Sequence, residues 1–412
     1  MTDRLKDSKT FCMMPWLHMH AFADGRVYPC CFGEYEMHMG NLRDNTMEEV
    51  WNNDAYKTMR KNMLNDLPCK ECTKCYEQEN NGVFSLRNSI NKEHGKYVNE
   101  VELTHEDGTH PEFKIRYWDI RFSNLCNFSC RTCGPVFSSN WYKEHLKMYG
   151  GKPKADNGRE LNVIEYTGRH KYDILEQMDP HFEHLDQIYF AGGEPLIMDE
   201  HYRILKRLVE KKMFHVKLKY NTNFSQMTYK DIDVMREWDK FEFVEIGASL
   251  DASHERGEYL RKGQSWEQVE ANRKRMFEIC PRAYFFLATC LDVFNSFHVP
   301  DFHIDWYKRG WIKNEGSLIN PLLTPGYLRI QMLPAHMKDQ LREKYRQAQE
   351  WMDTNTKDKS KRYDALIQFL DEADYSHKIK EWFETTEKLD KLRNENWRDV
   401  FPELQDLQNY VK

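Results

Sequence analysis

The chain has 412 residues, and its 60 Lys and Arg residues against 66 Asp and Glu residues give a formal net charge of −6. Its 40% hydrophobic and 14% aromatic content is enough for packed cores, so a mainly disordered protein is excluded, and its length predicts roughly two or three domains. The near-neutral charge makes a nucleic-acid partner unexpected. No apolar run approaches the ~20 residues that span a bilayer, and the charged first residues are unlike an export signal, so we expect a cytoplasmic protein without a membrane partner.

The first 95 residues are rich in cysteine and poor in apolar periodicity. They contain one clearly helical stretch, over residues 47–64, and a turn signal at Asp24-Gly25. A segment of this kind needs additional stabilisation, which a metal site would supply. We therefore expect an irregular N-terminal domain built around a metal centre.

Between residue 114 and about residue 333, short β-branched and aromatic runs alternate with helical patterns. Strands are expected at 115–122, 187–190, 215–220, 242–250, 284–291 and 327–332. Helices are expected at 199–212, 228–238 and 265–279. This β-α-β alternation predicts a parallel sheet or barrel, in which the chemistry lies on the loops that follow the strands.

After Gly326 the chain contains no glycine, and apolar residues recur at helical spacing around 363–370 and 379–383. This pattern predicts amphipathic helices that pack on the barrel. Residues 150–169 are polar and are expected to form a surface insertion. The domains that we predict are 1–97, 98–334 and 335–412.

Eleven cysteines in a chain without an export signal indicate metal or redox chemistry rather than disulfides. Cys126, Cys130 and Cys133 have the spacing C-x3-C-x2-C directly after the first expected barrel strand. Three thiolates on one short loop can hold three irons of a [4Fe-4S] cube and leave the fourth iron open to another ligand. The alternative is a structural zinc site, which would lack its fourth ligand here.

This motif resembles the signature of the radical S-adenosylmethionine (SAM) superfamily. A second motif, Gly192-Gly193-Glu194 after the second expected strand, is similar to the glycine-glycine-glutamate motif of that family. Glycines let the backbone approach a ligand closely, and the carboxylate can accept hydrogen bonds from a cationic amine. The resemblance implies an α/β fold in which a partial (β/α)6 barrel follows an auxiliary-cluster domain and precedes a helical C-terminal region.

Further similarities concern Asn223 after the third expected strand, Ser249 at the end of the fourth, and Arg261 in a turn before a helix. The resemblance implies that these residues bind SAM, with Arg261 pairing with the methionine carboxylate through its planar fork. The ordinary alternative for each is a cap, a turn residue or a surface charge. Thr132 stands where many family members carry an aromatic residue that packs against adenine.

The cysteines at the front resemble the twitch element, a shortened SPASM domain that holds one auxiliary [4Fe-4S] cluster. Four ligands are needed from six cysteines. The ligands that we expect are Cys12, Cys30, Cys72 and Cys75. Cys31 and Cys69 are left as spares or alternative ligands, and a four-cysteine zinc site is the competing interpretation. The nearby His18, His20 and His38 are expected at the surface or in caps rather than as ligands.

Cys280 and Cys290 stand alone in or beside an expected strand, where a lone cysteine is usually a small buried residue. Cys290 lies near the carboxyl end of its strand, which is expected to face the barrel cavity. Some radical enzymes use such a thiol to return hydrogen to the substrate, so Cys290 is the candidate catalytic residue. Residues 389–404 resemble the end of twitch-bearing radical proteins that phages often encode.

The resemblance implies an oxidoreductase that cleaves SAM reductively to methionine and a 5′-deoxyadenosyl radical, which abstracts hydrogen from a substrate C–H bond. The implied cofactors are two [4Fe-4S] clusters and SAM, and the implied electron donor is a protein such as flavodoxin or ferredoxin. We expect the substrate to be a peptide or protein side chain. The alternatives are oxidation or epimerisation of a small molecule such as a sugar or nucleoside, and a zinc-stabilised interaction protein without turnover.

Overall fold

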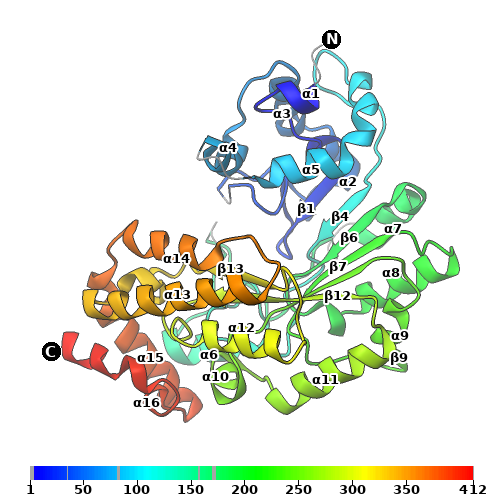
Figure 1. Cartoon of the computed structure of the whole chain (residues 1–412). Coiled ribbons are helices and arrows are strands. Elements are labelled where there is room, and N and C mark those ends of the chain that lie inside the picture. The colour runs from blue at the N-terminus through cyan, green and yellow to red at the C-terminus, as the bar shows by residue number, and fades with distance from the viewer. Residues whose placement is uncertain (1–3, 35, 81–83, 156–157, 169–172, 412) are drawn as a thin grey trace. The chain divides into compact units, whose positions relative to one another are not determined.

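The computed structural model describes residues 4–34, 36–80, 84–155, 158–168 and 173–411. The chain divides into two compact units and passes between them repeatedly, the last time within β7 (Lys217–Thr222). Unit 1 comprises Met1–Asn124, Ile164–Gly193 and Met198–Lys219, and unit 2 comprises Leu125–Val163, Glu194–Ile197 and Tyr220–Lys412. Figure 1 labels most of the helices and several of the strands.

Unit 1 contains a mixed sheet with the strand order β6, β4, β1, β2, β3. β1 (His18–Ala21) and β6 (Gln187–Phe190) lie on either side of β4 (Tyr117–Ile120) and run parallel to it. β2 (Arg26–Tyr28) and β3 (Gly40–Asn41) extend the sheet in antiparallel pairs. All side chains of β1 and β4 are buried, so this parallel pair forms the centre of unit 1.

Helices form much of the N-terminal part of unit 1. The α-helices of this unit are α1 (Arg4–Asp7), α2 (Met47–Trp51), α3 (Asp54–Leu64), α4 (Thr73–Asn80), α5 (Leu86–His94), α7 (Ile174–Met178) and α8 (Asp199–Glu210). Short 3-10 helices cover Met14–Trp16, Lys70–Cys72, Gly95–Leu103 and Asp179–His184. The single helix expected at 47–64 is divided, because the Asn53 side chain accepts from Tyr56 N and begins a new helix. The expectation of an otherwise irregular front segment is wrong, since α4, α5 and β1 also form there.

Unit 2 contains a parallel sheet in which β12 (Tyr284–Leu291) lies between β10 (Val244–Ala248) and β13 (Ser317–Pro321). It also has short antiparallel pairs, β5 (Ser129–Cys130) with β11 (Arg261–Lys262) and β8 (Thr228–Tyr229) with β9 (Ile232–Asp233). Its α-helices are α6 (Trp141–Tyr149), α9 (Val234–Trp238), α10 (His254–Leu260), α11 (Trp266–Ile279), α12 (Val299–Lys308), α13 (Ala335–Asn355), α14 (Arg362–Asp371), α15 (Ile379–Arg393) and α16 (Trp397–Val400). Its 3-10 helices cover Pro195–Ile197, Gly326–Leu328, Ile330–Met332, Ser376–Lys378 and Pro402–Tyr410.

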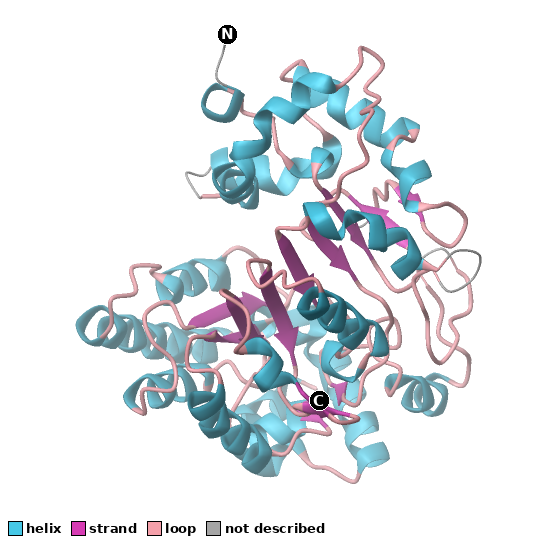
Figure 2. Cartoon of the chain, turned by 90° about the vertical axis from the view of Figure 1, so that its right-hand side faces the viewer, coloured by secondary structure: helices cyan, strands magenta, loops and turns pink. Residues whose placement is uncertain are grey.

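The strands β4, β6, β7, β10, β12 and β13 follow one another along the chain with helices between them. Figure 2 distinguishes these strands from the helices that pack on them. This order confirms the predicted α/β class and the alternation of a partial (β/α)6 barrel. The strands expected at 187–190 and 284–291 are found unchanged as β6 and β12, and β4, β7 and β10 overlap the strands expected at 115–122, 215–220 and 242–250.

Two predictions within unit 2 are wrong. The stretch at 327–332 forms two 3-10 helices, and the last strand is β13, which ends at Pro321. β13 lies at the edge of its sheet, where the missing N–H of a proline is tolerated. The helix expected at 228–238 is only α9, because the β8–β9 hairpin occupies its first residues.

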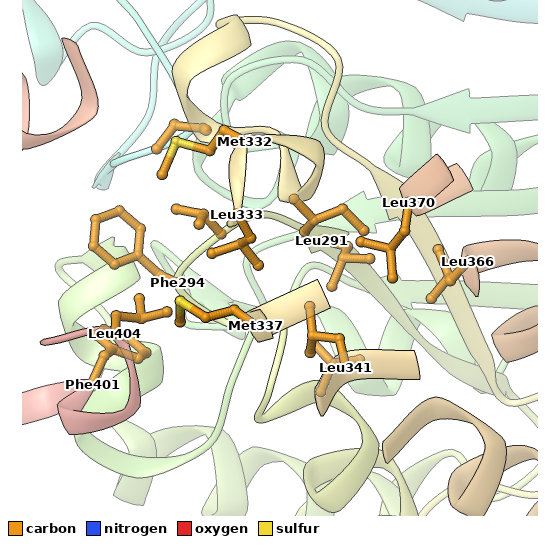
Figure 3. Close-up of a cluster of buried hydrophobic side chains, with 14 of the residues drawn as sticks. Leu291, Phe294, Met332, Leu333, Met337, Leu341, Leu366, Leu370, Phe401 and Leu404 are labelled. Carbon is orange, nitrogen blue, oxygen red and sulfur yellow. The ribbon is translucent and has the colours of Figure 1, made fainter. Parts of the chain in front are cut away.

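The C-terminal helices of unit 2 share one hydrophobic core with the end of β12. Figure 3 shows Leu291 near Leu370 of α14, in one cluster of buried residues that also contains Met337 and Leu341 of α13 and Phe401. This packing confirms the prediction of amphipathic helices after Gly326. No helix in the described ranges is both long and apolar enough to cross a membrane.

Candidate functional site

Cys126, Cys130 and Cys133 lie on one loop near the start of unit 2. Cys130 is buried in β5, and Cys133 N donates to Cys130 O at 3.0 Å in a tight turn. Trp141 Nε1 also donates to Cys130 O, at 2.7 Å, so the first turn of α6 anchors the loop. The structure thus places the predicted cysteines together on an anchored loop.

The Arg261 guanidinium lies next to one of these thiols, that of Cys130. Burial, and then the nearby Glu194 carboxyl, raises the pKa of Cys126 to about 12, and burial also raises the pKa of Cys130. The Arg261 guanidinium opposes the increase at Cys130, and its Nη1 donates to Cys130 Sγ at 3.7 Å. Because buried thiols ionise only when positive charge compensates them, this donor set fits an iron cluster held by three thiolates.

Glu194 is only 1% exposed, and hydrogen bonds hold its carboxylate. Its Oε1 accepts from Leu196 N at 3.1 Å and from Thr222 Oγ1 at 2.7 Å, and its Oε2 accepts from Asn223 N at 2.6 Å. Burial nevertheless raises the pKa of Glu194 to about 7. An ionised carboxylate has about four acceptor positions, so Oε2 keeps one for a further donor. A carboxylate oxygen of this kind can accept a hydrogen bond from a cationic amine.

The two glycines before Glu194 both adopt left-handed backbone conformations. Gly192 and Gly193 adopt φ angles of 82° and 48°, which favour glycine. A Cβ at Gly192 would lie 2.8 Å from Arg121 Cβ and 2.9 Å from Arg121 Cδ. Within unit 1, therefore, the group that needs room at Gly192 is the stem of the Arg121 side chain.

Asn223 connects the end of β7 with the cysteine loop. Its Nδ2 donates to Asn127 Oδ1 at 2.8 Å, and Asn127 Nδ2 donates to Ser225 Oγ at 3.0 Å. Ser225 Oγ closes the ring by donating to Asn223 Oδ1 at 2.6 Å. Ser249, which follows β10, is partly buried, and its N donates to Thr222 O at 2.8 Å. The predicted polar residues therefore lie at strand ends, and Asn223 reaches the loop through a closed ring of hydrogen bonds.

Arg261 is held by Asp251, the last residue of the Ser249-Leu250-Asp251 stretch, and this ion pair was not predicted from the sequence. Arg261 Nε lies 2.7 Å from Asp251 Oδ2, and Arg261 Nη2 donates to Asp251 Oδ1 at 3.0 Å. The same Oδ1 accepts from Cys290 N at 2.9 Å, so Asp251 joins Arg261 to the end of β12. Cys290 is partly exposed there, and burial together with Asp251 and Asp292 raises its pKa well above the usual value, which keeps the thiol protonated. The feature of the sequence that could have indicated this role is the position of Asp251, three residues after the end of β10.

The front cysteines of unit 1 line a separate pocket. This pocket of about 430 Å³, its mouth included, is lined by Cys12, Cys30, Cys72 and Cys75 among other residues. Cys31 is exposed and Cys69 is buried with its Sγ 3.8 Å from Met59 O, and neither lines the pocket. Burial raises the pKa of Cys12 and Cys30 to about 12. A donor set of four thiols around a pocket fits a fully ligated cluster. Within the described ranges no three His, Cys, Asp or Glu side chains are arranged to hold a single metal ion.

Unit 1 contains a buried network of charged side chains that was not predicted from the sequence. His20 Nδ1 lies 2.9 Å from Asp119 Oδ2, and Arg121 Nε lies 3.1 Å from Asp119 Oδ1. Although burial raises the pKa of Asp119, Arg121 and His20 lower it to about 2. His18 and His20 are buried in β1, so the expectation that they lie at the surface or in caps is wrong, whereas His38 is exposed. β1 has only four residues, His-Met-His-Ala, and this polar–apolar alternation is too short to indicate a strand in the sequence.

Residues 12–76 match the SPASM family, described as an iron-sulfur cluster-binding domain. This range contains the pocket cysteines described above. No curated protein sequence matches the chain.

Solved structures show partial likeness. One is anSMEcpe with bound AdoMet and Cp18Cys peptide, at 15% identity and a TM-score of 0.36 over 57% of this chain and 60% of that chain. Another is SuiB of Streptococcus suis bound to S-adenosylmethionine, at 13% identity and a TM-score of 0.32 over 56% of this chain and 42% of that chain. SuiB bound to its precursor peptide SuiA gives 13% identity and a TM-score of 0.39 over 81% of this chain and 68% of that chain. Over residues 12–76 the chain is therefore similar to the SPASM family, which confirms the predicted iron-sulfur cluster-binding domain at its front.

Proposed function

We propose that this chain is a radical SAM enzyme in which Cys126, Cys130 and Cys133 hold a [4Fe-4S] cluster with one iron open to SAM. The main support is the loop of three thiols, which shares unit 2 with the buried Glu194 and with the Arg261 fork. Glu194 N donates to Leu125 O at 2.8 Å, which ties the carboxylate segment to the start of the loop. When bound, the cluster and SAM supply the electron transfer and the 5′-deoxyadenosyl radical that abstracts hydrogen from a substrate C–H bond.

The residues of the chain would bind and orient SAM. Glu194 Oε2 would accept a hydrogen bond from the ammonium group. A guanidinium has five N–H donors, and those of Arg261 that face Asp251 and Cys130 are engaged, which leaves donors for the methionine carboxylate. Asn223 and Ser249 stand at strand ends and are proposed to contact the ribose and the methionine end of SAM.

We further propose that Cys12, Cys30, Cys72 and Cys75 hold a second [4Fe-4S] cluster. The SPASM match and the pocket support this ligand set. Zinc requires all of its sulfurs at about 2.3 Å from one ion, whereas a cube separates its ligands around a larger volume, which suits a pocket walled by thiols. The cluster would relay electrons or brace the fold. Cys72→Ala should remove about four irons per chain, and Cys69→Ala should remove none; equal loss from both variants would contradict the assignment.

We propose a peptide or protein side chain as the substrate, because the resemblance implies that relatives with an auxiliary cluster often act on peptides. Flavodoxin or ferredoxin would be the electron donor. We also propose a cytoplasmic location, which the eleven free thiols support, and the domain bounds 1–97, 98–334 and 335–412.

We propose that Cys290 returns hydrogen to the substrate radical. Unchanged turnover and product stereochemistry in Cys290→Ala would exclude this role.

The test is metal analysis of protein purified and reconstituted without oxygen. Two clusters predict about eight irons per chain with matching sulfide. Replacing Cys126, Cys130 and Cys133 together with alanine should remove about half of the iron and all formation of 5′-deoxyadenosine from SAM. Cys280→Ala is the matched control, because Cys280 is a buried cysteine outside both sites. Full iron content in the triple variant, or stoichiometric zinc without iron in the parent protein, would overturn the proposal.

A further inference from the structure

The cysteine loop contains a buried cation, Arg131, between two of the proposed ligands. Its side chain is only 3% exposed. Arg131 Nε donates to Tyr259 O at 3.1 Å, and its guanidinium carbon lies 3.6 Å from the centre of the Tyr259 ring. Arg131 Nη2 donates to Asp390 Oδ1 and, at 2.6 Å, to Glu395 Oε2. Both counter-charges of this loop residue therefore come from the C-terminal region of unit 2.

The two carboxylates are themselves fixed. Asp390 Oδ1 accepts from Tyr259 OH at 2.8 Å, and its Oδ2 accepts from Trp397 N at 2.7 Å. Glu395 Oε1 lies 2.7 Å from Lys262 Nζ in β11, the strand that pairs with the cysteine loop. Asn394 ends α15 in the left-handed conformation, and Glu395 N then donates to Asp390 O at 2.9 Å. This tight turn places both carboxylates on one cation.

Arg393 makes a second contact with the loop, at Ser129, one residue before Cys130. Arg393 Nη2 donates to Ser129 O at 2.6 Å and pairs with Glu144 Oε2 of α6 at 2.6 Å. Leu389 and Leu392 of α15 pack on Trp141 and Met148 of α6. Figure 1 shows α15 beside α6 and α10 in unit 2. The end of α15 therefore holds the loop through backbone, charge and apolar contacts.

The charges in this network bear on any redox centre held by the loop. The reduction potential of an iron-sulfur cluster depends on nearby charge and hydrogen bonds, and low-dielectric surroundings strengthen such effects. Arg131 contributes a fixed positive charge next to Cys130, while Asp390 and Glu395 contribute negative charge. Removing a cation should make one-electron reduction harder, and removing an anion should make it easier.

We propose that Asp390, Glu395 and Arg131 are positioning residues that fix the Cys130–Cys133 segment and set the reduction potential of the [4Fe-4S] cluster proposed there. This inference rests on the proposed function. It assigns a role to the last part of the chain that no cysteine motif indicates.

The test is an anaerobic redox titration of the full-length reconstituted protein with dithionite as reductant, followed by electron paramagnetic resonance. The signal that changes on addition of SAM identifies the cluster of the Cys126 loop. Glu395→Gln should raise its midpoint potential and Arg131→Gln should lower it. Such opposite shifts are a signature of charge, because a merely loosened loop would affect both variants in the same direction. Glu403→Gln is the matched control, since Glu403 pairs with Arg256 in the same C-terminal region and should leave the potential unchanged.

The outcomes separate the two proposals. Shifts of the same sign, or no shift in Glu395→Gln, would overturn the positioning role. Should Arg131→Gln fail to fold, Arg131→Lys keeps the charge, and Asp390→Asn provides a second anion variant with an expected rise. A parent protein without any signal that responds to SAM would instead contradict the proposed function. A normal parent signal with potentials equal to the control would contradict only the role of residues 390–395.

Discussion

Asp119 illustrates how much a single buried charge depends on its neighbours. It is fully buried between His20 and Arg121, and Arg121 is itself only 14% exposed. Removing one partner of a buried ion pair leaves the other charge without compensation, and this loss is far larger than the net contribution of the pair. The free energy of unfolding of unit 1 should therefore be sensitive to this carboxylate.

We expect Asp119→Asn to lower the free energy of unfolding by roughly 3–5 kcal/mol, because Arg121 would stay buried without its counter-charge. Chemical denaturation followed by fluorescence would measure the change. Asp107→Asn is the control, since Asp107 is 59% exposed and pairs with Lys57 at the surface. If the two substitutions lowered the free energy of unfolding equally, the buried ion pairs of Asp119 would contribute no more to stability than a surface pair.

Single residues were predictable where spacing along the chain carries the information. The loop of Cys126, Cys130 and Cys133 could be identified because its ligands are neighbours in sequence. The contacts of Asp251 and Asp119 could not be predicted, because they depend on partners that only the fold brings close: Arg261 and Cys290 for Asp251, and His20 and Arg121 for Asp119.

Among the elements, the break between α2 and α3 depends on one capping side chain. Asn53 accepts from Tyr56 N at 3.1 Å, and its Nδ2 donates to Met39 O at 2.6 Å, so it also fixes the chain that leads into β3. An N-cap of this kind satisfies a backbone donor that no intrahelical acceptor can reach. Loss of this cap should therefore reduce the stability of the segment that joins α2 and α3.

We expect Asn53→Ala to lower the free energy of unfolding by ~1–2 kcal/mol, since it removes the cap and the hydrogen bond to Met39. Lys61→Ala, at an exposed position of α3, should change it little. Thermal and chemical unfolding would compare the two variants. If the cap variant were as stable as the lysine variant, the helix break would have another cause.

Strands were predictable where β-branched and aromatic residues gather in a short run. β6 and β12 were found at their predicted bounds because they lie within parallel sheets and are largely buried. The stretch at 327–332 shows the limit. Leu328, Ile330 and Met332 are all buried, so the alternation correctly indicated burial. It did not determine the backbone hydrogen bonds, because successive 3-10 turns on a hydrophobic core bury the same side chains.

For the whole molecule, buried neutral histidines should limit stability in acid. Burial lowers the pKa of His303 to about 3, and Thr289 Oγ1 lies 2.9 Å from its Nε2. His18 and His201 have pKa values lowered to about 3 by burial, and His181 and His298 to about 4. Unfolded histidine binds its proton near pH 6.5. The unfolded state therefore holds more protons between these values, and the free energy of unfolding falls as the pH drops below about 6.5.

We expect His303→Gln to reduce the loss of stability between pH 7 and pH 5 by ~2 kcal/mol, because glutamine does not bind a proton on unfolding. Chemical denaturation at both pH values gives this difference for each protein, whatever the stability at pH 7. His336→Gln, at an exposed position, should leave the difference unchanged. If His303→Gln lost as much free energy of unfolding between pH 7 and pH 5 as the parent protein, groups other than His303 would cause the acid sensitivity.

The hold of residues 390–395 on Arg131 has a consequence for biosynthesis. Arg131 is separated from Asp390 by 259 positions and from Glu395 by 264. While a ribosome is still extending the chain, the cysteine loop has already emerged but its carboxylate partners do not yet exist. The loop gains these two ion pairs only after residues 390–395 have been synthesised and have left the ribosome. For the cluster proposed at this loop, we therefore expect iron and sulfide to be inserted only after residues 390–395 have been synthesised.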